Sequence, residues 1–105
     1  MNLYVDVAVR VVDGTKLDAV EAAVRAVLER EEIDRWFGAC ERSPETVFGG
    51  TLLTLRADRA EPAIIISGFG RWEPAFQDSL ERAAATAAGA RCNVYLSFEF
   101  PDDEE

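Results

Sequence analysis

Two stretches of strictly alternating residues, one near each end of the chain, constrain the fold most. From Leu3 to Val11 every second residue is leucine or valine, and from Cys92 to Phe100 every second residue is again apolar. Successive side chains of a strand point to opposite faces, so this period predicts two strands, each with one face toward a core. Pro101 is expected to end the second of them, because proline cannot donate to a strand ladder.

Two segments between these strands show the spacing of amphipathic helices. Apolar residues recur every three or four positions from about Lys16 to Glu31 and again from about Glu73 to Ala88. Pro74 suits the first turn of the second segment, and Gly89 suits its end. We therefore expect two helices, each with one buried face.

The middle of the chain predicts two more strands. Thr51–Arg56 and Ala63–Ser67 are rich in β-branched and leucine residues and are separated by a break that contains Pro62. Three isoleucines in a row, Ile64–Ile66, indicate a strand that is buried on both faces. We expect this strand at the centre of the sheet.

The segment from residue 32 to residue 50 is the least regular part of the sequence. It is long for a connection in a compact domain, where about 4–6 residues are usual. An extra turn of helix, a small hairpin about Ser43-Pro44-Glu45, and a functional loop all fit the sequence.

The resulting order, βαββαβ, predicts an α+β fold of ferredoxin-like type, a two-layer sandwich in which two helices cover one face of a four-stranded antiparallel sheet. Residues 1–101 form a single predicted domain, and residues 102–105 form an acidic tail. The opposite face of the sheet stays open. Alternation assigns to it Tyr4, Asp6, Arg10, Thr54, Arg56, Tyr95, Ser97 and Glu99, together with one or two isoleucines.

Charge narrows the class of partner. The 105 residues include 20 acidic and 11 basic side chains, a net charge of −9, which opposes binding to nucleic acid or to anionic lipid. No apolar run approaches the ~20 residues that cross a bilayer. The first residues do not form a secretory signal, so we expect a cytoplasmic protein.

The residue types limit the chemistry. Histidine is absent, so a Ser–His or Cys–His catalytic pair cannot form, and Cys40 and Cys92 supply at most two ligands for zinc. We expect no cofactor, no metal and no catalytic residue. Asp6 and Glu99 are expected near one another on the sheet, neutralised by Arg10 and Arg56.

Two aromatic segments have two possible roles. Trp36 lies in the irregular segment, and Arg71-Trp72 precede the predicted second helix. Both tryptophans either cap the ends of the core or, with Arg71, form an anchor for a protein partner, because Trp and Arg are frequent in binding hot spots.

The small, acidic build of the chain, the segment Gly68–Phe76 and the acidic C-terminus resemble the immunity proteins with which bacteria inhibit their own toxins. The resemblance implies a non-catalytic protein-binding module that inhibits a basic toxin, such as a nuclease. The residues expected to contact such a partner are Trp36, Arg71, Trp72, Tyr95, Glu99, Asp102 and Asp103.

Two other functions remain open. A ferredoxin-like domain can form a homodimer through its open sheet face and bind a small ligand or regulate another protein. A dimeric α+β barrel can act as a cofactor-free enzyme, and Asp6, Arg56 and Tyr95 are the groups that such an enzyme would use here.

Overall fold

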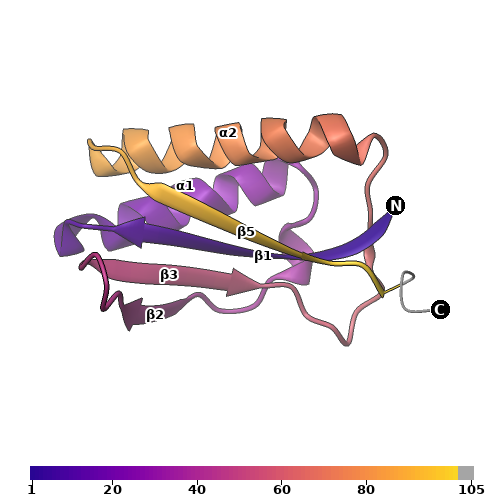
Figure 1. The fold of residues 1–105 in the computed structure, drawn as a ribbon, viewed down its shortest axis with the longest axis horizontal. Helices are drawn as coiled ribbons and strands as arrows, with labels where there is room; N and C mark the ends of the chain where they lie inside the picture. The colour runs from indigo at the N-terminus through magenta and orange to yellow at the C-terminus, as the bar shows by residue number, and fades with distance from the viewer. Residues whose placement is uncertain (102–105) are drawn as a thin grey trace.

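In the computed structural model, residues 1–101 are described, and they form two helices packed on one face of a five-stranded antiparallel sheet (Figure 1). This confirms the expected α+β class and both helices, with one strand more than the four predicted. The strands are β1 (Asn2–Val11), β2 (Glu41–Pro44), β3 (Thr51–Arg56), β4 (Ile64–Ile65) and β5 (Asn93–Glu99). The helices are α1 (Leu17–Arg30) and α2 (Phe69–Ala88), with 3-10 turns at Gly14–Lys16 and Asp34–Trp36.

Strand β1 lies at the centre of the sheet. It pairs with β3 from Asp6 to Val11, with β5 from Tyr4 to Arg10 and, at its start, with β4 at Asn2 and Leu3. Strand β2 extends the sheet beyond β3. The alternating residues of β1 and β5 bury one face against the helices, as predicted. The core contains, among others, Val5, Val7, Val9, Val24, Leu28, Leu53, Leu55, Phe76 and Leu80.

The prediction that Ile64–Ile66 form a central strand buried on both faces is wrong. Strand β4 has only two residues, and it pairs with the very start of β1. Ile64 and Ile66 are buried, but the side chain of Ile65 is 75% exposed. Strand β3 lies beside β1 instead, and pairs with it from Asp6↔Arg56 to Val11↔Thr51.

The segment 32–50 contains the small hairpin that was one of the three alternatives. Strands β2 and β3 pair from Glu41↔Thr54 to Pro44↔Thr51, and residues 45–50 make the turn between them. The carboxylate of Glu45 stabilises the turn, because it accepts hydrogen bonds from the backbone N–H groups of Val47 and Phe48 at 3.0 and 2.7 Å.

Helix α2 begins at Phe69, one turn earlier than the predicted start at residue 73. Gly68 adopts a left-handed conformation, φ 66°, which reverses the chain direction before the helix. Phe69 then packs edge-on against Phe98 of β5, with ring centres 5.2 Å apart. The helix ends at Gly89 as predicted. Although α2 has 20 residues, neither described helix is long and apolar enough to cross a membrane.

The hairpin is tied to α1 through Arg42, whose Nη2 donates to Asp18 at 2.6 Å and to Glu21 at 3.2 Å. Burial raises the pKa of Glu21, but its bonds to Arg42 and Arg25 outweigh burial and leave the pKa below its ordinary value of 4.5. A lowered carboxyl pKa stabilises the folded state above pH 4.5, and this contribution is lost as the pH falls through the folded-state value.

We expect Arg42→Met to lower the urea concentration at the midpoint of unfolding at pH 7, and we expect the difference from wild type to shrink below pH 4.5. Arg82→Met, which removes an ion pair within α2, is the control; an equal deficit at every pH would contradict the assignment to Glu21.

Candidate interaction surface

The face of the sheet opposite the helices is uncovered in the described chain. The strand registers place Ala8 between Thr54 of β3 and Tyr95 of β5, and Asp6 between Arg56 and Ser97. This arrangement confirms the side chains that alternation assigned to the open face. Tyr95 is 46% exposed in the middle of the face.

An ion network closes one end of the open face. Arg59, in the loop after β3, donates to both oxygens of Asp6, at 2.7 Å from Nη1 to Oδ1 and at 3.1 Å from Nη2 to Oδ2. Its Nε donates to Glu99 at 3.2 Å. Asp6 and Glu99 therefore do lie together, but Arg59 neutralises them, and the expected role of Arg10 and Arg56 is wrong. The sequence analysis did not identify Arg59 as the partner of these carboxylates. Arg59 lies in a loop, and a loop has no side-chain periodicity from which its position could be predicted.

Two backbone contacts immobilise this network. The carboxylate of Asp6 also accepts from the N–H of Ala57 at 3.1 Å, and Arg59 donates to the carbonyl of Ala57 at 2.8 Å. The guanidinium lies 5.0 Å from the ring centre of Tyr4 and covers it. The hydroxyl of Tyr4 donates to the carbonyl of Glu61 at 2.6 Å. Tyr4 is thus buried beneath Arg59, and both oxygens of Asp6 accept hydrogen bonds.

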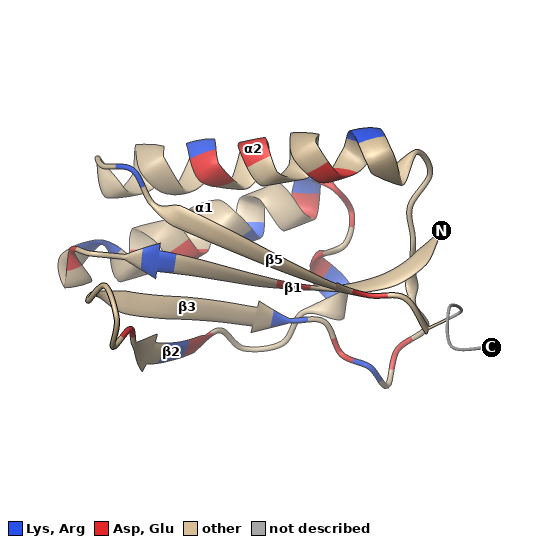
Figure 2. Cartoon of the chain, in the orientation of Figure 1, with Lys and Arg blue, Asp and Glu red and all other residues tan. Residues whose placement is uncertain are grey.

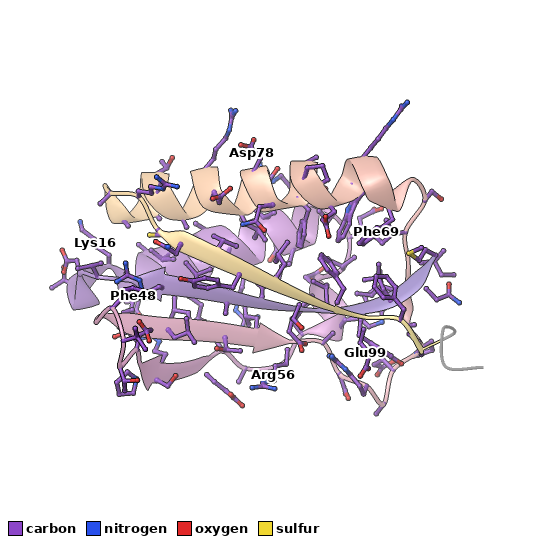
Figure 3. All side chains as sticks on the ribbon, viewed as in Figure 1. Lys16, Phe48, Arg56, Phe69, Asp78 and Glu99 are labelled. Carbon is purple, nitrogen blue, oxygen red and sulfur yellow. The ribbon has the colours of Figure 1, made fainter. Side chains whose placement is uncertain are left out.

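The other end of the open face is bounded by the β2–β3 turn. Arg10 of β1 donates from Nη1 to the carbonyls of Phe48 and Gly49, at 3.3 and 3.1 Å, and lies 5.9 Å from the Phe48 ring centre. The turn is therefore fastened to the sheet. It nevertheless leaves Val47 and Phe48 76% and 74% exposed. Figure 3 shows Phe48 at the opposite end of the sheet from Glu99.

Val47 and Phe48 were missed as candidate contact residues. They lie in the segment for which the sequence left three structures open, so their exposure was not predictable from a pattern. Two glycines directly after them, Gly49 and Gly50, were the available signal of a tight turn. Both adopt positive φ angles, 80° and 82°.

Trp36 and Trp72 both cap the core, which was one of the two alternatives considered. Trp36 packs against the core, and its indole N–H donates to the carbonyl of Pro62 at 2.6 Å, while Arg35 lies 4.2 Å over its ring. Trp72 stacks on Phe76 with ring centres 4.5 Å apart. Its indole N–H donates to Glu31 at 2.7 Å and so joins α2 to the end of α1.

The other predicted contact residues do not gather at one site. Tyr95 and Glu99 share the open face of β5, whereas Arg71 is exposed on α2, on the helix side of the sheet. Asp102 and Asp103 lie outside the described residues. The five described residues of this set therefore do not form one surface, and of these five the open face carries Tyr95 and Glu99.

A cleft of about 610 Å³ lies beside the ion network. Its lining includes three basic side chains, Arg35, Arg56 and Arg59, and three acidic ones, Asp6, Asp58 and Glu61. Arg56 has one long ion pair, 3.8 Å to Glu41, and both side chains are largely exposed. This volume is within the range of small-molecule sites, about 300–1,000 Å³.

The cysteines are consistent with structural roles. Burial raises the pKa of the Cys92 thiol, which lies in the core as predicted. Burial, with Glu21 nearby, also raises the pKa of the half-buried Cys40 thiol. In the described part of the chain, no three His, Cys, Asp or Glu side chains are grouped as metal ligands.

Comparison with known protein-family models and with curated proteins finds no match to this chain.

Proposed function

We propose that this chain is a non-catalytic protein-binding module that receives its partner on the open face of the sheet. The observation that carries the proposal is the distribution of charge on that face. Its central row, Thr54, Ala8 and Tyr95, is uncharged, and the charged Glu41 lies beyond Thr54 on the edge strand β2. Charged groups lie at its two ends, Arg10 at one and the Asp6–Arg59–Glu99 network at the other (Figure 2).

This distribution matches the anatomy of protein interfaces, in which a desolvated centre with few charges and an aromatic anchor is surrounded by a polar rim. Tyr95 supplies an aromatic side chain at the centre, and Phe48 supplies a second one at the rim. The turn that carries Phe48 is held by Glu45 and Arg10, so binding would require little ordering of the chain.

The charge of the chain favours a basic partner. At −9, it attracts a basic protein at long range and accelerates encounter at low salt. We propose, as the finer function, that the module inhibits a basic toxin in the manner of bacterial immunity proteins. This finer proposal rests on the charge and on the resemblance of the sequence.

The arrangement of the strands supports a ferredoxin-like fold as the finer description of the architecture. With the two-residue β4 left aside, the sheet order is β2-β3-β1-β5, and α1 and α2 follow β1 and precede β5. This is the order expected of a split βαβ pair. In such a domain the uncovered sheet face is the natural place for a partner.

A matched pair of variants tests the binding face. Thr54→Arg places a cation in the uncharged centre, whereas Thr86→Arg adds the same charge on the exposed side of α2. With a candidate basic toxin as ligand, we expect Thr54→Arg to weaken binding by about 100-fold or more, and Thr86→Arg to leave it nearly unchanged. Calorimetric titration measures both.

A growth assay tests inhibition itself. The toxin alone should arrest growth of its host, and co-expression with wild-type chain or Thr86→Arg should restore growth, whereas Thr54→Arg should not. Equal affinity of the two variants would exclude the open face. Tight binding without restored growth would leave a binding module and exclude the inhibitor.

The cleft supports a second candidate function, a module that binds an anionic small molecule. Arg35 and Arg56 present guanidinium groups to it, and guanidinium groups recognise carboxylate and phosphate oxygens in pairs. Thr54 does not line this cleft. The Thr54→Arg variant would therefore retain ligand binding and lose only the protein partner.

A further inference from the structure

The two edges of the sheet differ in how well they are protected. The β2 edge is four residues long and carries Glu41, Arg42 and Pro44, which discourage pairing with another strand. The β5 edge is seven residues long and pairs regularly with β1 along its inner side. No strand of the described chain pairs with its outer side, and Glu99 at its end is its only charged residue. Such an edge is a template for a further strand.

One side-chain contact shows which backbone groups point outward. Gln77 of α2 donates from Nε2 to the carbonyl of Val94 at 2.9 Å, so this carbonyl faces away from β1. Backbone groups alternate in direction along an antiparallel strand. The N–H and C=O groups of Leu96 and Phe98 therefore face the same way, and they have no hydrogen-bond partner within residues 1–101.

We propose that a second copy of this chain pairs with this edge, with the two β5 strands antiparallel about a two-fold axis at Tyr95. Val94 and Leu96 of one copy then lie opposite Leu96 and Val94 of the other and exchange backbone hydrogen bonds. The carbonyl of Val94 retains a second lone pair for this bond beside Gln77. Tyr95 lies opposite Tyr95 of the copy in a non-hydrogen-bonded pair, the geometry that brings side chains closest.

The side chains favour this occupant because the register is self-complementary. It places Asn93 opposite Ser97 and Arg91 opposite Glu99 of the copy, twice by symmetry. Arg91 is exposed and has no ion pair among the described residues. Glu99 uses only Oε2 for Arg59, so Oε1 is available to Arg91. The two Tyr95 side chains then lie side by side where the two open faces join, and both open faces remain available to a partner.

Sedimentation equilibrium of the full chain, without any partner, tests the association. We expect a species of twice the chain mass of 11.6 kDa. Arg91→Glu places two carboxylates opposite each other and should raise the dimer dissociation constant by about 100-fold. Arg71→Glu makes the same change on α2 and should have no such effect. A wild-type chain that stays monomeric up to millimolar concentration, or equal effects of the two variants, would overturn the proposal.

Cysteine cross-linking tests the register. In a Cys40→Ser background, Tyr95→Cys brings two thiols together on the axis, whereas Ser97→Cys places each thiol opposite Asn93. With oxidised glutathione, we expect a disulfide-linked dimer from Tyr95→Cys at dilute concentration and none from Ser97→Cys. Cross-linking of Ser97→Cys instead would show that Tyr95 does not lie on the axis and would overturn this pairing.

Discussion

Replacing Phe76 with alanine is expected to lower the free energy of unfolding by about 3–5 kcal/mol, the range for buried phenylalanine. Phe76 is 1% exposed, and its ring stacks on Trp72 at 4.5 Å with an angle of 15° between the planes. The substitution leaves a cavity between α2 and the sheet and removes the support of Trp72. Chemical denaturation monitored by tryptophan fluorescence measures the loss.

Phe48→Ala is the matched control, because it removes the same ring from a site that is 74% exposed. Its effect on stability should stay within about 0.5 kcal/mol. If Phe48→Ala were as destabilising as Phe76→Ala, the β2–β3 turn would be part of the core and Phe48 could not be a binding residue.

The position of Trp72 changes how its variants should be interpreted. Since Trp72 stacks on Phe76 and donates to Glu31, Trp72→Ala removes a contact between the two helices. Loss of binding in that variant would follow from loss of stability. The aromatic residues that report on binding alone are Tyr95 and Phe48.

Gly50→Ala is expected to have the second largest effect. A Cβ at this position would lie 2.6 Å from the carbonyl oxygen of Val11, and the φ of 82° is unfavourable for alanine. Gly49 has a similar φ of 80° but nothing within 4 Å of its Cβ position. Both substitutions incur the backbone penalty of about 1–2 kcal/mol, and Gly50→Ala should lose about 1–3 kcal/mol more through overlap.

The difference in stability between the two glycine variants isolates the energetic effect of the close contact between the turn and the end of β1. Equilibrium unfolding of Gly49→Ala and Gly50→Ala measures it directly. Equal stabilities would show that the chain relieves the overlap by a small shift. We also expect Gly50→Ala to bind its partner more weakly than Gly49→Ala. The overlap with Val11 would displace the turn, and with it Phe48 and the carbonyl groups to which Arg10 donates.

The first and last strands of the chain were predictable because the pattern that identifies them, the alternation of apolar and polar residues, is local in the sequence. In β1 and β5, each side chain takes one of two faces, so alternation assigns Val9 to the core and Tyr95 to the open face without knowledge of the neighbours. The same holds for the end of α2, where Gly89 has the left-handed φ that a helix end favours.

Other features depended on contacts between distant residues. Ile64–Ile66 have an intrinsic preference for a strand, but their pairing partner is the start of the chain, where Ile64 and Ile65 pair with Leu3 and Asn2 and Ile66 exchanges hydrogen bonds with Met1. The partner of Asp6 and Glu99 was unpredictable in the same way, because Arg59 reaches them from a loop 53 and 40 residues away in sequence.

Side-chain periodicity was thus sufficient to predict the α+β class, both helices and which residues lie on the open face, since these follow from geometry repeated every two or 3.6 residues. Other features follow from pairing between segments that are far apart in the chain. These are the order of the strands, the two tryptophans that cap the core, the exposed turn at Phe48 and the unprotected edge of β5. Competition among possible partners, which depends on the whole fold, selected β3 over β4 as the neighbour of β1 along most of its length and left the outer edge of β5 without a strand partner among residues 1–101.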